Sequence, residues 1–180
     1  MGRSAANELP ERAPPESSRR SGLDAGGSQD PPMPTQTLVV HRMIRATPEG
    51  VYRAFVLPEA WAKWLPPHGF AARVEEMDVR VGGRYRMTFV HLATGDAHSF
   101  GGEYRELVPG ARLRYSACFD DPSLPGEMQT TVTLLPVPGG SELRAVQEGI
   151  PEVIPLAACQ LGWQESLALL ALLVESAASG

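Results

Sequence analysis

The stretch Val79–His91, VRVGGRYRMTFVH, decides the fold because it places two adjacent glycines between two strand-like runs. Glycine pairs with basic neighbours also occur in loops that bind phosphate. Such loops, however, follow the pattern GxGxxG or GxxxxGK(S/T) and lead into a helix whose N-terminus faces the phosphate. Neither pattern is present, and no helical sequence follows Gly83. Gly82 and Gly83 therefore predict a tight turn between two strands, and a nucleotide site is excluded.

The two glycines also predict which side chains share a face. A three-residue turn with a glycine at positive φ pairs Val79 with Tyr85 and Met77 with Met87. A turn centred between the glycines would instead pair Asp78 with Met87, an unfavourable lining for a buried face. The side chains expected on the inner face are therefore Tyr85, Met87 and Phe89. The arginines expected to point to solvent are Arg80, Arg84 and Arg86.

Strand-like segments and turn residues alternate over most of the chain. One strand is expected at Thr37–Arg45, and six more are expected near 71–81, 84–92, 97–107, 112–119, 128–135 and 142–148. Residues typical of turns, mainly Gly, Pro and Asp, separate the six later strands. Short turns join antiparallel neighbours, so this pattern predicts an antiparallel sheet.

Helical patterns lie between and after the strands. Thr47 is a candidate N-cap with Pro48 at the first helical position, and a second short helix is expected over Glu59–Leu65. A long helix is expected over Pro155–Ser176, with an apolar face of Leu156, Cys159, Trp163, Leu167, Leu170 and Val174. The fold class is therefore α+β, with the long helix covering the apolar face of the sheet.

The turns between the later strands predict the cross-strand partners. A turn at Thr94-Gly95 predicts the pairs Tyr85–Tyr104, Phe89–Phe100 and His91–His98. A turn at Pro109-Gly110 predicts Tyr104–Tyr115 and Phe100–Phe119. A turn around 138–140 predicts Leu134–Leu143, Val132–Ala145 and Thr130–Gln147. All of these registers place the aromatic residues on one face.

This inner face combines aromatic rings with a few polar groups. Such a surface is typical of a ligand pocket, and equally of a packed core whose tyrosines reach polar partners. The small residues Gly102 and Ala117 at its centre favour a hollow. The residues expected to contact a ligand are Tyr85, Met87, Phe89, Phe100, Tyr104, Tyr115, Phe119, Gln147 and Trp163. Trp64 is expected to anchor the short helices, and a ligand lid is the alternative role for Trp61.

Two residues are candidates for acid–base catalysis. Strand alternation from Met77 places Glu75 on the inner face, where desolvation would raise its pKa. His68 follows the second short helix, near the mouth of a pocket. A solvated strand end and an ordinary loop histidine are the competing interpretations, and they are favoured.

His91 and His98 at the rim of the sheet are candidates for a metal site. Asp96 or Asp121 would supply a carboxylate, yet catalytic zinc takes three protein ligands, and no HExxH motif or cysteine cluster is present. The favoured interpretation is a solvated hairpin. No metal and no cofactor are therefore predicted.

The composition excludes several classes of protein. The chain has 180 residues and a formal net charge of −5, which gives no general attraction to nucleic acid or anionic membranes. No secretory leader is recognisable, and the run Leu167–Val174 is too short to span a bilayer. Cys118 and Cys159 lack the spacing of a disulfide framework, which favours a reducing cytoplasm. Residues 1–36 are rich in Pro, Ser and Gly, so a disordered tail is expected.

Five segments, in order, resemble the Activator of Hsp90 ATPase homologue-like branch of the START-like (SRPBCC) superfamily. They are TPEGVYRAFVLPEAWAKWLPPHGF, MDVRVGGRYRM, GGEYRELVPGARLRYS, TTVTLLPVPGGSELRAVQEG and LGWQESLALLALLVE. The resemblance implies a helix-grip domain over residues 37–178, in which a curved antiparallel sheet wraps around a long C-terminal helix and encloses a cavity. Members include lipophilic-ligand binders, polyketide cyclases or aromatases, and Hsp90 co-chaperones, so the resemblance implies a pocket but no single reaction.

The sequence therefore predicts a module that binds a small apolar or aromatic molecule. An enzyme of the cyclase or hydrolase type, acting in the same pocket, is the alternative. Hsp90 is the less favoured partner, because the eukaryotic activators carry a further N-terminal domain where this sequence has only its tail. Nucleic acid and membranes are not expected as partners, and a homodimer is left open.

Overall fold

The computed structural model describes residues 33–178. The strands are β1 Thr35–Ile44, β2 Phe70–Met77, β3 Arg84–His91, β4 Ala97–Val108, β5 Arg112–Phe119, β6 Met128–Val137 and β7 Gly140–Pro151. The helices are α1 Pro48–Val56, α2 Pro58–Trp64 and α3 Leu156–Ala178. Most of the expected tail 1–36 lies outside the described residues. Thr35 and Gln36, however, already belong to β1, so ordered structure begins earlier than expected.

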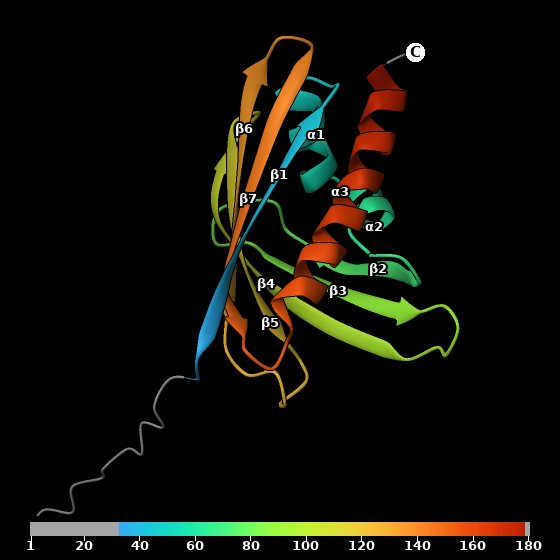
Figure 1. The fold of residues 1–180 in the computed structure, drawn as a ribbon, viewed down its shortest axis with the longest axis vertical. Coiled ribbons are helices and arrows are strands. Elements are labelled where there is room, and N and C mark those ends of the chain that lie inside the picture. Colours follow the sequence, from blue (N-terminus) through green and yellow to red (C-terminus); the bar gives the residue numbers. More distant parts are fainter. Residues whose placement is uncertain (1–32, 179–180) are drawn as a thin grey trace, which may run out of the picture. The chain divides into compact units, whose positions relative to one another are not determined.

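The seven strands form one antiparallel sheet in the order β1-β7-β6-β5-β4-β3-β2. Strands β2 to β7 make a meander, and β1 pairs with the last strand, β7. Figure 1 shows the three helices on one side of this sheet, with α3 running along it and β2 and β3 extending beneath the first turns of α3. This is the α+β helix-grip arrangement that the sequence predicts.

Trp64 joins the two short helices. The side chain of Thr47 caps α1 by accepting a hydrogen bond from the Gly50 backbone N–H at 3.2 Å, as expected. The Trp64 indole N–H donates to the Ala54 carbonyl at 2.8 Å, and the Trp64 ring meets Phe55 edge-on at 4.6 Å. Trp64 is fully buried, so it anchors α2 on α1.

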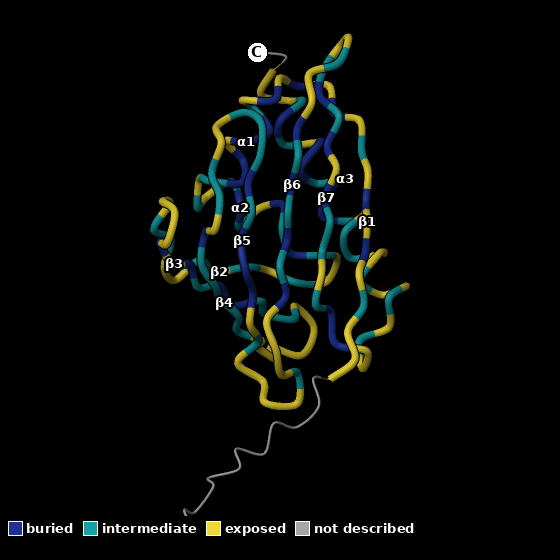
Figure 2. The backbone as a smooth tube through the Cα atoms, turned by 90° about the vertical axis from the view of Figure 1, so that its left-hand side faces the viewer, coloured by how far each residue is buried: buried dark blue, intermediate teal, exposed yellow. Residues whose placement is uncertain are grey.

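The β6–β7 hairpin has the expected register throughout, and in the β4–β5 hairpin the expected pairs occur beyond a β-bulge between Tyr104 and Glu106. The confirmed pairs are Tyr104–Tyr115, Phe100–Phe119, Leu134–Leu143, Val132–Ala145 and Thr130–Gln147. Buried and half-buried residues alternate along much of β6, because one face of the strand meets the core (Figure 2). The short turn with glycine leaves little freedom in the pairing of β6 with β7, and this makes their register readable from the sequence.

The hairpin between β3 and β4 has a different register. Phe89 lies opposite His98, two residues from its expected partner. The reason is the loop 92–95, which is closed by a hydrogen bond of 2.8 Å from the His91 N–H to the Asp96 carbonyl. The wrong pairs are Tyr85–Tyr104, Phe89–Phe100 and His91–His98. A shift of two residues keeps every side chain on its face, so the aromatic residues still share the inner face.

The corner between β2 and β3 is wider than expected. Strand β2 ends at Met77, which lies opposite Tyr85, and a β-bulge falls between Val74 and Glu76. The loop occupies residues 78–83, so the expected pairs are wrong, namely Val79–Tyr85 and Met77–Met87. The bulge also shifts the alternation of inward and outward side chains along β2 by one residue.

The two glycines of this corner meet different steric demands. Gly82 has the expected positive φ, 82°, and an added Cβ atom there would have no atom within 4 Å. A Cβ atom at Gly83 would instead lie 2.0 Å from the Asp78 carbonyl oxygen. The corner is also bonded to β4, since the Gly82 N–H donates to the Tyr104 carbonyl at 2.8 Å and the Gly83 carbonyl accepts from the Tyr104 N–H at 2.9 Å.

Helix α3 is long and apolar enough to cross a membrane by length and composition, a criterion that the core helix of a soluble protein also meets. Helix α3 contacts β1, α1 and α2. Its side chains that are buried in the domain are Ser166, Leu167, Leu170, Ala171 and Val174. The described residues therefore have the packing of a soluble domain, with α3 as the gripped helix.

We predict that Gly83→Ala destabilises the domain more than Gly82→Ala. At Gly83 the added methyl group meets a backbone carbonyl, and overpacking of this kind costs about 3 kcal/mol. At Gly82 the cost is that of the left-handed conformation alone, about 1 kcal/mol, and Gly82→Asn should recover part of it. Urea unfolding followed by circular dichroism measures the free energies of unfolding. A larger loss for Gly82→Ala would contradict these steric roles.

Candidate functional site

A cavity of about 220 Å³ lies between the inner face of the sheet and α3. Its walls come from α2, from strands β3 to β7 and from the N-terminal half of α3. Most of the residues expected to contact a ligand line this cavity: Tyr85, Phe89, Phe100, Tyr115, Phe119, Gln147 and Trp163. The face identified from strand alternation therefore surrounds a hollow.

Met87 and Tyr104 are not among the residues that line the cavity. Met87 has no exposed surface and Tyr104 is 1% exposed, so both belong to the packed core. The ring of Tyr85 packs on that of Tyr104, with centroids 5.8 Å apart. Burial raises the pKa of Tyr104, and its hydroxyl has no hydrogen-bond partner within residues 33–178. Tyr104 is therefore a structural residue.

Edge-to-face contacts hold the aromatic wall of the cavity. The ring centroids of Phe89 and Phe100 are 4.9 Å apart, and those of Phe100 and Phe119 are 6.2 Å apart. Trp61 of α2 meets Tyr85 at 5.0 Å and is 1% exposed. Trp61 therefore forms the cavity wall on the side of α2.

The two tyrosines of the cavity are neutral groups. The Tyr85 hydroxyl donates a hydrogen bond of 2.6 Å to the Ser116 carbonyl. Burial raises the pKa of Tyr85 far above the usual range of a phenol. Burial also raises the pKa of Tyr115, and the neighbouring Thr130 side chain offsets only part of that shift. Both phenols therefore stay protonated at physiological pH.

Gln147 supplies an amide group to the cavity. The Trp163 indole N–H donates to Gln147 Oε1 at 2.8 Å, which links α3 to β7. Gln147 Nε2 lies 3.7 Å from Met128 Sδ. Thr130 lies opposite Gln147 on β6, so the polar groups continue along one row of the sheet.

One stripe of α3 faces the cavity. Its members are Cys159, Gly162, Trp163 and Ser166, which recur at the three- and four-residue spacing of one helical face. A Cβ atom at Gly162 would have no atom within 4 Å, so the absent side chain leaves open space. The Ser166 hydroxyl donates to the Leu65 carbonyl at 2.7 Å and joins α3 to the end of α2.

The sequence-based expectation places Thr130 on this face and His98 at its rim, but it omits several other residues of the wall, including Pro67, Met128, Gly162 and Ser166. The helical spacing of α3 contains the signal for Gly162 and Ser166, since both lie on the face of Trp163. Alternation along β6 contains the signal for Met128. No local pattern identifies Pro67, because only the packing of its loop against α3 brings it to the cavity.

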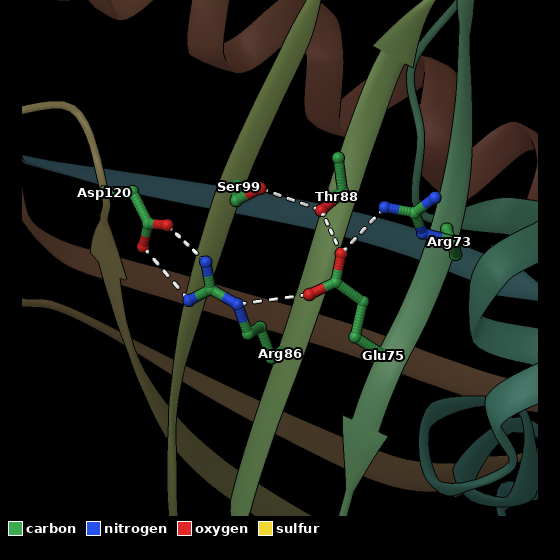
Figure 3. Close-up of polar contacts among 6 residues, drawn as sticks. All are labelled: Arg73, Glu75, Arg86, Thr88, Ser99 and Asp120. Atoms are coloured by element: carbon green, nitrogen blue, oxygen red, sulfur yellow. Dashed lines mark hydrogen bonds and ion pairs between the residues drawn. The ribbon is translucent and has the colours of Figure 1, made fainter.

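Glu75 lies on the outer face of the sheet, so its expected place in the cavity is wrong (Figure 3). The β-bulge at this position breaks the alternation counted from Met77. The Glu75 carboxylate accepts from Thr88 Oγ1 at 2.7 Å and from Arg73 Nη2 at 3.0 Å. These hydrogen bonds, that of Thr88 first, lower the pKa of Glu75, whereas the expected desolvation would have raised it.

Glu75 belongs to a charged network on this outer face. Arg86 donates to Glu75 through Nε at 3.1 Å and pairs with both carboxylate oxygens of Asp120. Thr88 Oγ1 lies 2.8 Å from Ser99 Oγ (Figure 3). The hydrogen bond from Arg86 also lowers the pKa of Asp120. Glu75 therefore has the environment of an ion-pair partner and not that of a general base.

The histidine candidates have different surroundings. The His68 side chain is exposed, lies 3.5 Å from the Glu165 carboxylate and is absent from the cavity wall. His91 lies opposite Phe70 of β2, while His98 lines the cavity from β4. Within residues 33–178, no group of three or more His, Cys, Asp or Glu side chains is placed to hold a metal ion.

The comparisons with known proteins agree with this fold. Protein CV1439 from Chromobacterium violaceum is 57% identical, with 77% of this chain and 96% of that chain covered and a TM-score of 0.76. A protein from Rhodobacter sphaeroides is 25% identical, with 79% and 99% covered and a TM-score of 0.68. An AHSA1-like protein from Aeromonas hydrophila, 22% identical, has the same fold, with 79% and 94% covered and a TM-score of 0.65. No curated protein matches the chain.

The family relationship follows from the match along the chain. The model of the family described as Activator of Hsp90 ATPase homolog 1-like protein matches residues 45–175, which include all three helices almost to the end of α3. The helix-grip architecture and the cavity beneath α3 are those expected of START-like proteins. The chain therefore belongs to the Activator of Hsp90 ATPase homolog 1-like family.

Proposed function

We propose that the protein binds a small hydrophobic or aromatic molecule in the cavity between the sheet and α3. The observation that carries this proposal is the cavity itself, about 220 Å³ with mainly aromatic and aliphatic walls. Its volume lies between the roughly 150 Å³ of an apolar cavity that holds benzene and the roughly 300 Å³ at which pockets for larger ligands begin. A molecule with one or two small rings fits this space best.

An enzyme of the polyketide cyclase or hydrolase type has less support. Among the described residues, the cavity wall includes no carboxylate, and its one imidazole is that of His98. The candidate base Glu75 is engaged on the outer face. Support for Hsp90 as a partner comes from the family relationship alone. As the compartment we propose the cytoplasm, because Cys118 and Cys159 are free thiols.

We predict that a bound probe protects Cys159 from alkylation and leaves Cys118 unprotected. Cys159 lines the cavity, whereas Cys118 is exposed on β5. Burial raises the pKa of both thiols, so iodoacetamide should be used near pH ~8.5, where more thiolate is present. Ethylbenzene near its solubility limit should slow alkylation of Cys159 severalfold, measured by peptide mass spectrometry. Equal rates at Cys159 with and without ethylbenzene would count against the proposal.

A second prediction concerns Gly162, whose missing side chain leaves open space in the cavity wall. Gly162→Leu should fill this space and weaken ethylbenzene binding at least about tenfold, a loss of about 1.4 kcal/mol. The same change should not lower the melting temperature, because leucine is a better helix former than glycine by up to about 1 kcal/mol. Calorimetry and thermal unfolding measure the two effects.

The matched control for Gly162→Leu is Ala168→Leu. Ala168 is exposed on the same helix, so the added side chain points away from the cavity. Ethylbenzene binding should stay at the wild-type level in this variant. Unchanged binding in Gly162→Leu would show that the ligand occupies another part of the molecule.

A further inference from the structure

A row of polar side chains crosses the mainly apolar cavity. Tyr115, Thr130 and Gln147 are cross-strand neighbours on β5, β6 and β7, and all three line the cavity. Trp163 of α3 ends the row by donating its indole N–H to Gln147 Oε1 at 2.8 Å. A ligand that touches this row meets several hydrogen-bonding groups there.

The contact with Trp163 fixes the orientation of the Gln147 amide. An indole N–H donates and never accepts, so the amide atom that faces it must be the oxygen. The Nε2 group is then left with Met128 Sδ at 3.7 Å, and a thioether is a weak acceptor. Among residues 33–178, the Gln147 amide hydrogens therefore have no strong acceptor. They lie next to the cavity that Gln147 and Met128 both line.

The charge of the cavity restricts its occupant further. Among the described residues, its wall contains no Asp, Glu, Lys or Arg side chain, and His98 is the one side chain there that can carry a positive charge. Burial keeps the phenols of Tyr85 and Tyr115 protonated by raising their pKa values. While His98 is neutral, an ionised group would lose its hydration without gaining a counter-ion, which is costly. The cavity should therefore reject carboxylates and amines and accept neutral molecules.

The shape of the wall selects an aromatic body. Phe89, Phe100 and Phe119 form a chain of edge-to-face contacts along the cavity, so one more ring can join the same arrangement. The volume of about 220 Å³ leaves room for one substituted ring or a compact pair of rings. The Gln147 amide hydrogens lie at the polar row, where an oxygen substituent of such a ring would be placed.

We infer that the occupant is a neutral, compact aromatic compound that carries one oxygen acceptor, such as a ketone, and that this oxygen accepts from Gln147 Nε2. Trp163 acts as the positioning residue, because it holds the amide in the orientation that offers a donor. This inference rests on the proposed function, since it specifies what the same cavity binds.

The test compares acetophenone with ethylbenzene, which have nearly the same shape and differ in the carbonyl oxygen. Their affinities also differ by hydration, so the informative quantity is how each affinity changes on mutation. Gln147→Met removes the amide and keeps the length of the side chain. This variant should bind acetophenone about five- to tenfold more weakly, which is the effect of one hydrogen bond. Its affinity for ethylbenzene should change less than about twofold.

Trp163→Phe tests the positioning role. It removes the N–H and keeps an aromatic ring, so the amide of Gln147 loses its fixed orientation. The affinity for acetophenone should fall about threefold more than the affinity for ethylbenzene, because the Gln147 amide then offers its N–H to the ligand only part of the time. Dissociation constants come from calorimetry or NMR titration, with circular dichroism to verify that each variant is folded. If Trp163→Phe does not fold, Gln147→Met alone decides the inference.

The outcomes separate this inference from the proposed function. If neither probe binds the wild-type protein, the proposed function fails and the inference fails with it. If both probes bind and Gln147→Met weakens them equally, or changes neither, the cavity binds apolar molecules and the inference is overturned. Tight binding of benzoate by a His98→Gln variant would also overturn it, since the described wall then holds no side chain that can supply a cation.

Discussion

Hydrogen bonds tie helix α3 to β7, to the end of α2 and to the residue after β1, and the cavity depends on the spacing that they define. Trp163 donates to Gln147 of β7, and Ser166 donates to a carbonyl at the end of α2. Near the other end of the helix, the Arg45 backbone N–H donates to Glu175 Oε1 at 2.9 Å. Directional bonds of this kind define a separation, whereas apolar contacts alone favour the closest packing.

The two halves of α3 meet the sheet differently. In the C-terminal half, Leu170 and Val174 are buried and fill the space beneath the helix. In the N-terminal half, Cys159 and Trp163 are half-buried and border the hollow. Gly162 lies on the same face as these two and adds no side chain. One continuous apolar stripe therefore gives a packed core at one end and a cavity at the other.

Whether a register shift spans an even or an odd number of residues determines how much of this site can be predicted from the sequence, because only an odd shift moves a side chain to the other face. The β3–β4 hairpin differs from the expected register by two residues, so Phe89 keeps its place on the inner face. The bulge in β2 is an odd shift and moves Glu75 to the outer face, yet FAARVEEM contains no residue that marks a bulge. Alternation also cannot separate Tyr85 from Tyr104, because tertiary contacts, such as that of Trp61, decide which one faces the hollow.

The sheet separates charged side chains from neutral ones. On the outer face, Arg86 forms ion pairs with Glu75 and Asp120 and so compensates their negative charge. On the inner face, the described wall of the cavity has no charged side chain other than His98 when that residue is protonated. A transition state that develops charge needs preorganised counter-charges or several donors, and this wall offers few. A neutral molecule needs none of them, so retention of a neutral ligand requires less of the cavity than turnover would.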